Sequence, residues 1–167
     1  MSESSTRARV YAIVNAVSNV GLVYDYARWA VLWDEVLALF KTTIGSTDMI
    51  RGWVITCTGW TSAYLDGLYP DDNGKAIELR DYTYKIRGVF SLDDSAATEK
   101  TAVGIVEDVA EALNKNTSLH SYAAIAEPYF GPIPPASLDV FEARMFGSVL
   151  CHYAEITQRV VEAIVPA

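Results

Sequence analysis

The most constraining feature of the sequence is the stretch from Leu79 to Ala112, where the spacing of apolar residues changes from every second position to every third or fourth. Apolar and polar residues first alternate, which is the pattern of a strand with one buried face. The apolar set is Tyr82, Tyr84, Ile86 and Phe90, and the polar set is Asp81, Thr83, Lys85 and Arg87. This alternation predicts a strand from Leu79 to about Phe90.

An amphipathic helix is predicted directly after this strand. Its apolar stripe consists of Ala102, Val103, Ile105, Val106, Val109, Ala110 and Leu113. The spacing predicts that Val106 faces the core and Glu107 faces solvent. Asp93, Asp94 and Ser95 offer side-chain acceptors for the free amides at the helix start. The two aspartates could instead form an acid–base pair, but no catalytic partner lies nearby in the sequence, so capping is favoured.

The first 43 residues are predicted to form two helices with a short extended piece between them. Helical spacing of valines and an isoleucine indicates a helix over residues 6–19, LVYDYARW reads as extended, and WAVLWDEVLALF begins a helix ending near Thr43. Arg7 and Arg9 before an apolar run also resemble a signal peptide, but polar residues interrupt the run and no cleavage site follows. No stretch approaches the roughly 18 uninterrupted apolar residues of a membrane span. We therefore expect a soluble, cytoplasmic protein without membrane contact.

The middle of the chain is predicted to form a hairpin. MIRGWVITCTGW, from Met49 to Trp60, is β-branched and aromatic and reads as a strand. The loop over about residues 62–78 contains Asp71, Asp72, Asn73 and Gly74. Asn-Gly is a preferred pair for a tight reversal. A calcium loop of the EF-hand type needs a closing glutamate at its twelfth position, and Glu78 falls too early, so a hairpin tip is favoured.

The last third holds four of the six prolines, Pro128, Pro132, Pro134 and Pro135, and we expect a stiff extended loop over about residues 127–137. Two long strands are predicted after it, LDVFEARMFG and SVLCHYAEITQRVVE, with a reversal at Gly147–Ser148. The order of elements predicts an α+β fold: a largely antiparallel, mixed sheet with two to three helices packed on one face.

Composition limits the classes to which the chain can belong. Its 167 residues suit one domain over 1–167, and the 51% apolar and 20% charged content is typical of a globular protein. The net charge of −8 argues against a protein that tracks nucleic acid through clustered basic residues. Cys57 and Cys151 are too few for a disulfide framework, and neither they nor the two histidines have zinc-ligand spacing, so buried free thiols are expected. The sequence contains no phosphate-binding loop, GxSxG or HExxH motif, and we expect no catalytic residue, metal or cofactor.

Three segments carry a family resemblance: LVYDYARW, IRGWVIT, and the strand–helix stretch YTYKIRGVFSLDDSAATEKTAVGIVEDVAEAL. Together with the order of elements, they resemble the tail terminator, or tail completion, proteins of long-tailed bacteriophages. The likeness covers most of the chain, and its motifs are structural.

The resemblance implies a structural virion protein without enzymatic activity, assembled in the host cytoplasm and located at the neck of the virion. In that family, six identical subunits form a ring that caps the tail tube and joins it to the head–tail connector. DNA passes through the bore without specific binding. The expected partners are therefore other copies of the chain, the tail tube protein and the connector. Loop exposure suggests the interface residues, which are Tyr69, Asp71, Asp72, Asn73, Tyr129, Phe130 and Pro134.

Two other functions stay open. A head-completion or neck protein shares the small body and the ring symmetry of a tail terminator. A small enzyme or ligand-binding protein would use a pocket lined by the aromatic residues Tyr24, Tyr26, Trp29, Trp33, Trp53, Trp60 and Tyr64. Aromatic residues at strand and helix spacing usually belong to the core, so the pocket is the weaker interpretation.

Overall fold

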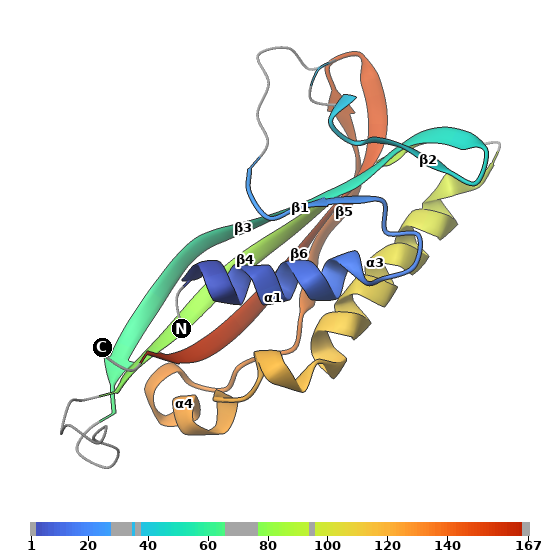
Figure 1. Cartoon of the computed structure of the whole chain (residues 1–167). Helices are drawn as coiled ribbons and strands as arrows, with labels where there is room; N and C mark the ends of the chain where they lie inside the picture. Colours follow the sequence, from blue (N-terminus) through green and yellow to red (C-terminus); the bar gives the residue numbers. More distant parts are fainter. Residues whose placement is uncertain (1–2, 28–34, 36–37, 66–76, 94–95, 165–167) are drawn as a thin grey trace.

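The computed structural model describes residues 3–27, 35, 38–65, 77–93 and 96–164. Its centre is a mixed sheet of six strands: β1 Leu22–Tyr24, β2 Lys41–Ile44, β3 Thr47–Tyr64, β4 Glu78–Ser91, β5 Ser137–Phe146 and β6 Val149–Ile164 (Figure 1). Within these ranges three α-helices occur: α1 Glu3–Asn15, α3 Thr98–Lys115 and α4 Ala123–Phe130. A 3-10 helix, η1, spans Thr117–Leu119. The α+β prediction is confirmed.

The sheet has the order β1-β3-β4-β6-β5, and β2 also pairs with β3. β1 runs parallel to β3, whereas every other pair among these strands is antiparallel. β3 and β4 pair from Arg51–Phe90 to Tyr64–Glu78, so they form the predicted hairpin. The tip predicted at Asp71–Gly74 falls outside the described residues. Both strands are present where the sequence predicted them, β3 from its β-branched and aromatic residues and β4 from its alternation, and both are longer than predicted.

Two Gly-Ser pairs make the tight reversals of the sheet. Gly45 joins β2 to β3 and Gly147 joins β5 to β6, with φ angles of 65° and 64°. Glycine with positive φ at the first central position is the arrangement of a type II′ turn, whose twist suits antiparallel strands. The reversal predicted at Gly147–Ser148 is confirmed, as are the two long strands around it.

α1 and α3 pack side by side on one face of the sheet, which we call the inner face (Figure 1). Val10 and Val14 of α1 and Val109 of α3 are completely buried there against the central strands. The predicted apolar stripe of α3 is confirmed, because its buried residues are Ala102, Ile105, Val106, Val109 and Leu113. Glu107 is exposed, as its position outside the stripe predicted.

The start of α3 differs from the prediction. The residue before the helix is Ala97, which has a left-handed conformation and makes no side-chain cap. Asp93 lies earlier in the chain, where its backbone N–H and C=O bond the hydroxyl of Thr98. The Asp93 carboxylate accepts the backbone N–H of Ala96 at 3.4 Å, two residues before the helix, so it binds a free amide as predicted but does not cap α3 itself. Asp94 and Ser95 lie outside the described residues. A threonine that folds back on the preceding loop replaces the acidic cap.

α4 corrects the prediction of an extended loop over 127–137. The helix includes Pro128 and ends at Phe130, so only residues 131–136 connect to β5 without regular structure. Its Ala126 is fully buried against Leu79 of β4 and Val161 of β6. These two residues alternate along their strands with the residues of the inner face, so they lie on the opposite face of the sheet, which we call the outer face. This apolar contact outweighs the poor helix propensity of proline.

The first third of the chain also departs from expectation. α1 ends at Asn15, earlier than predicted. The predicted helix beginning at WAVLWDEVLALF lies mostly outside the described residues, and its predicted end near Thr43 is wrong. Lys41–Ile44 instead form β2, because the β-branched Thr-Thr-Ile sequence pairs with the first residues of β3.

Candidate interaction surface

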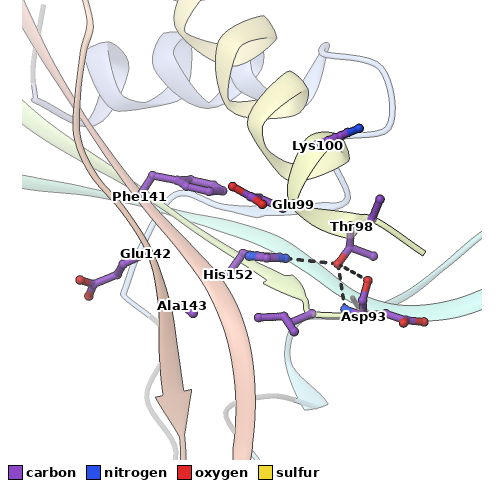
Figure 2. A pocket seen from close by; sticks show the side chains of 10 residues that line it. Asp93, Thr98, Glu99, Lys100, Phe141, Glu142, Ala143 and His152 are labelled. Atoms are coloured by element: carbon purple, nitrogen blue, oxygen red, sulfur yellow. Dashed lines mark hydrogen bonds between the residues drawn. The ribbon is translucent and has the colours of Figure 1, made fainter. Parts of the chain in front are cut away.

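The strongest candidate for a chemical site is a pocket of about 520 Å³ at the start of α3 (Figure 2). It is lined by Leu92, Asp93, Ala97, Thr98, Glu99, Lys100, Phe141, Glu142, Ala143 and His152. His152 comes from β6 and is 7% exposed, its ring stacks on Phe141 of β5, and its Nε2 lies 3.2 Å from Oγ1 of Thr98. The pocket therefore lies where the sheet, the β5–β6 hairpin and α3 meet.

The hydrogen bonds of Thr98 favour a structural role for this cluster. Its hydroxyl accepts from the backbone N–H of Asp93 at 2.8 Å and donates to the backbone C=O of Asp93 at 3.1 Å. A hydroxyl has one proton to donate, so His152 must donate to it from Nε2. A nucleophilic threonine needs the opposite arrangement, in which the imidazole accepts the hydroxyl proton. The cluster fixes the start of α3 to β6.

No group of three or more potential metal ligands occurs among the residues that the structure describes. Cys151 is buried, as expected, whereas Cys57 is only half-buried, and both thiols are free. Burial raises the pKa of both thiols, which keeps them in the protonated form at neutral pH.

The outer face of the sheet carries a network of paired charges. Nζ of Lys85 lies 2.7 Å from Asp139 and 2.9 Å from Glu155, and Arg87 bonds the other oxygen of Glu155 at 2.7 Å. Asp81, which is 5% exposed, pairs with Arg159. These charged residues of the outer face thus neutralise one another locally.

The pKa values in this network follow from these contacts. The hydrogen bonds that Lys85 donates to Asp139, and then to Glu155, raise the pKa of Lys85. Burial alone would raise the pKa of Asp139, but hydrogen bonds from Lys85 and Thr157 together lower it. Glu155 behaves in the same way: its burial is outweighed by bonds from Lys85 and Arg87, and its pKa is lowered. All three groups stay charged at neutral pH.

Exposed apolar side chains gather at one end of the sheet, on the β5–β6 hairpin. Met145, Val149 and Leu150 are 56%, 36% and 42% exposed, and we call them the hairpin-tip patch. Met145 and Leu150 are register partners, so their side chains lie together on the inner face. The hairpin is at the top of Figure 1, beyond the part of the sheet that α1 covers.

α4 lies at the opposite end of the sheet (Figure 1), and it carries a second set of exposed apolar side chains. Ile125 and Tyr129 are 43% and 38% exposed, and we call them the α4 patch. The buried side of α4 rests on Leu79 and Val161, near the start of β4 and the end of β6. α4 is therefore a rigid platform and its exposed apolar residues have a fixed position.

The interface residues suggested by the sequence lie in two regions. Tyr69, Asp71, Asp72 and Asn73 are outside the described residues. Tyr129 is exposed on α4, and Pro134 is exposed in the segment after it. Phe130, the last residue of α4, is half-buried against the cluster that holds α4 on the sheet. Its backbone C=O accepts a hydrogen bond from Arg159 at 3.3 Å. The structure thus brings Tyr129, Phe130 and Pro134 to the same end of the sheet.

The sequence reasoning missed the hairpin-tip patch and the end of β3. Trp53 is completely buried, as expected for an aromatic residue at strand spacing, but Trp60 and Tyr64 on the same strand are 61% and 63% exposed. Trp29 and Trp33 lie outside the described residues. Trp60 and Tyr64 lie beyond the β-bulge at Cys57/Gly59. The signal in the sequence was the absence of charge from ITCTGWTSAY, which is unusual for an exposed strand.

A scan against models of known protein families finds no match, and a search of curated proteins finds none that is similar. Among the helices that the structure describes, none is both long enough and apolar enough to span a bilayer.

Proposed function

We propose that this chain is a ring-forming structural protein of a phage tail, a tail terminator that caps the tube and joins it to the head connector. The observation that carries the proposal is the pair of exposed apolar surfaces, the hairpin-tip patch and the α4 patch, at opposite ends of one sheet. A terminator needs two such docking surfaces, because it must match the tube on one side and the connector on the other.

The scaffold between the two patches is rigid. β6 runs from Val149 at the tip to Val161 beneath α4, which is about 40 Å at about 3.3 Å per residue. It pairs with β4 along almost its whole length, and its middle is buried under α3. Surfaces held apart at a fixed distance can bind two partners simultaneously without losing conformational freedom between them on binding.

Charge agrees with the proposal. With a net charge of −8 and paired cations on the outer face, the protein offers passing DNA little excess positive charge. A bore lined by such subunits would let the phosphate backbone slide rather than hold it.

A deletion mutant of the parent phage tests the proposal. A tube polymerises through an open head-to-tail interface until a subunit with a different upper face occupies its end. Micrographs of lysates from the deletion mutant should therefore show tails of uncontrolled length beside unjoined, filled heads. A neck protein, the second candidate, would leave tails of normal length and heads that leak DNA, and that result would overturn the terminator assignment.

Single-patch variants sharpen this test. Leu150→Asp puts a charge into the hairpin-tip patch, and Tyr129→Asp does so in the α4 patch. We expect one of them to give long tails and the other to give capped tails that fail to join heads. Glu127→Gln, an exposed change on α4 outside the α4 patch, is the matched control and should assemble normally. Identical defects from both patch variants would contradict the assignment of one patch to each partner.

A further inference from the structure

The two lateral edges of the sheet differ in how they are covered. β1 and β2 pair with the first part of β3, up to Val54. In the described part of the chain no strand pairs with the same edge from Thr58 to Tyr64, which we call the β3 edge. At the other side of the sheet, β5 is the last strand. Each edge leaves backbone groups that can extend the sheet.

The direction of these backbone groups follows from the ladder. The backbone N–H of Leu65 donates to the C=O of Ile77, at 2.9 Å, so the backbone groups of Leu65 point toward β4. By alternation, Trp60, Ser62 and Tyr64 point their backbone groups away from β4, toward the open side.

β5 presents its backbone in the matching way. Phe146 and Val149 flank the two-residue turn and thus form a hydrogen-bonded pair within the hairpin. Alternation then directs the backbone groups of Met145, Ala143 and Phe141 away from β6. At both edges, the residues whose backbone N–H and C=O groups point away from the sheet carry their side chains on its inner face.

The β3 edge lacks the usual protection against pairing. The residues from Ile55 to Tyr64 include neither a charged side chain nor a proline. Natural sheets guard exposed edges with such residues, and a long uncharged edge is a site for strand addition. Trp60 and Tyr64 flank this edge with large exposed rings.

We propose that the β3 edge accepts β5 of a second copy of this chain, so that the sheets of neighbouring subunits join edge to edge. β5 runs antiparallel to β3 within the chain, because three antiparallel pairings separate them. A neighbour in the same orientation therefore places β5 antiparallel to the β3 edge, as in the rest of the sheet. The inference rests on the proposed ring, and it names the junction between ring subunits.

The side chains agree with this junction on both faces. On the inner face, exposed Met145 of the incoming strand would lie beside Trp60 and Tyr64, which leaves Val149 and Leu150 of the hairpin-tip patch for the tube or the connector. On the outer face, Glu142 and Arg144 would lie beside a polar hollow of about 490 Å³. That hollow is lined by Thr58, Gly59, Trp60, Thr61, Asp81, Thr83 and Arg159. Apolar groups thus meet apolar groups, and polar groups meet polar ones.

The two edges lie toward opposite ends of the sheet. β5 pairs with β6 only up to Thr157, which is level with Thr56 of β3, whereas the β3 edge begins at Thr58. Head-to-tail contacts between different edges can close into a ring, whereas a symmetric contact of one edge with itself gives a dimer. In a closed ring this offset requires strands that are inclined to the axis, as they are in closed sheets.

Cross-linking of mixed subunits tests the pairing. Ser62→Cys and Ala143→Cys are prepared separately in a Cys57→Ser background, each at an exposed position with outward backbone groups. A short bismaleimide tolerates a register shift of two residues, about 7 Å along a strand. We expect a covalent dimer when the two variants are mixed and none with either alone. Cross-linking of Ser62→Cys with itself would overturn the proposed occupant in favour of a symmetric β3 contact, and that of Ala143→Cys in favour of a β5 contact.

A proline variant provides a second, independent readout. Ser62→Pro removes one outward N–H from the β3 edge without touching the ladder to β4, and edge strands tolerate proline. Native mass should fall to that of the monomer, with an unchanged circular dichroism spectrum. Ser62→Ala keeps the N–H and should keep the wild-type mass. A ring of native mass that gives no cross-link in any mixture would overturn this junction and leave the ring proposal standing. If the ring cross-links as expected but the deletion mutant of the phage still makes normal tails, the proposed function is overturned and the junction stands.

Discussion

The middle of the sheet and its margins use similar side chains for different purposes. Around β4 and β6, aromatic and aliphatic residues such as Tyr84 and Ile156 are completely buried. At the margins, Trp60 and Met145 are more than half exposed although they belong to strands of the same sheet. Large apolar residues at an edge or tip add little to the stability of a monomer, whereas they can supply much of the binding energy at an interface. The difference places the stability of the fold in the centre of the sheet, and it supports the proposal that copies of the chain associate through its margins.

The largest effect is expected from a charge in the centre. Val106→Asp places a carboxylate on the buried side of α3, at a position that is 2% exposed, where it has no partner. We expect a loss of about 4 kcal/mol or more in the free energy of unfolding, or insoluble protein. Glu107→Gln is the matched control on the exposed side of the same helix and should change stability by less than about 0.5 kcal/mol. Equal urea midpoints for the two variants would contradict the orientation of α3.

The buried ion pair between α1 and β6 should come next. Glu162 is 1% exposed and pairs with Arg9, which also donates to the C=O of Ser118 at 2.9 Å. Arg9→Met leaves the carboxylate buried without its partner, at a cost of about 3 kcal/mol. The double variant Arg9→Met with Glu162→Leu should recover most of this loss, because no charge is left unpaired. A double variant as unstable as the single one, measured by chemical denaturation, would show that packing of Arg9 dominates.

Lowering the pH should have a smaller effect on the free energy of unfolding, through the ion pairs of the outer face. The pKa values of Asp139 and Glu155 are lowered in the folded state, so these groups stabilise the fold above their unfolded pKa values, about 4. This stabilisation is lost as pH falls through the lower, folded pKa values. Because the pairs are partly exposed, the effect should be about 1 kcal/mol. Lys85→Met should flatten the dependence of the urea midpoint on pH between about 5 and 3, and an unchanged slope would mean that the pairs contribute nothing.

The smallest effect on stability is expected at the hairpin tip. Met145→Asp changes a side chain that is 56% exposed, so the free energy of unfolding should change by less than about 0.5 kcal/mol. The same variant should nevertheless weaken assembly, because the charge enters an apolar contact. Thermal unfolding and native mass measured on one sample would separate the two outcomes. A strongly destabilised variant would place Met145 in the folding core and contradict the comparison.

How much of this structure the sequence predicts depends on how local each determinant is. The strand of Tyr82, Tyr84 and Ile86 and the helix of Val106 and Val109 follow from periodicity, since one buried face dictates both patterns. α4 escaped prediction because its stability comes from contact with Leu79 and Val161, which are distant in the sequence. The hairpin-tip patch and the β3 edge escaped it for a similar reason. Exposure of Trp60 or Met145 depends on where neighbouring elements stop, which no local pattern records.

The central claim is that copies of this chain associate through the margins of a stable sheet, and native mass spectrometry tests it most directly. Wild-type protein at micromolar concentration should show a closed oligomer, and six copies of the 18.3 kDa chain would give about 110 kDa. Ser62→Pro should reduce this mass to 18.3 kDa while its thermal unfolding stays close to that of the wild type. A wild-type protein that remains an 18.3 kDa monomer at every concentration tested would contradict the claim.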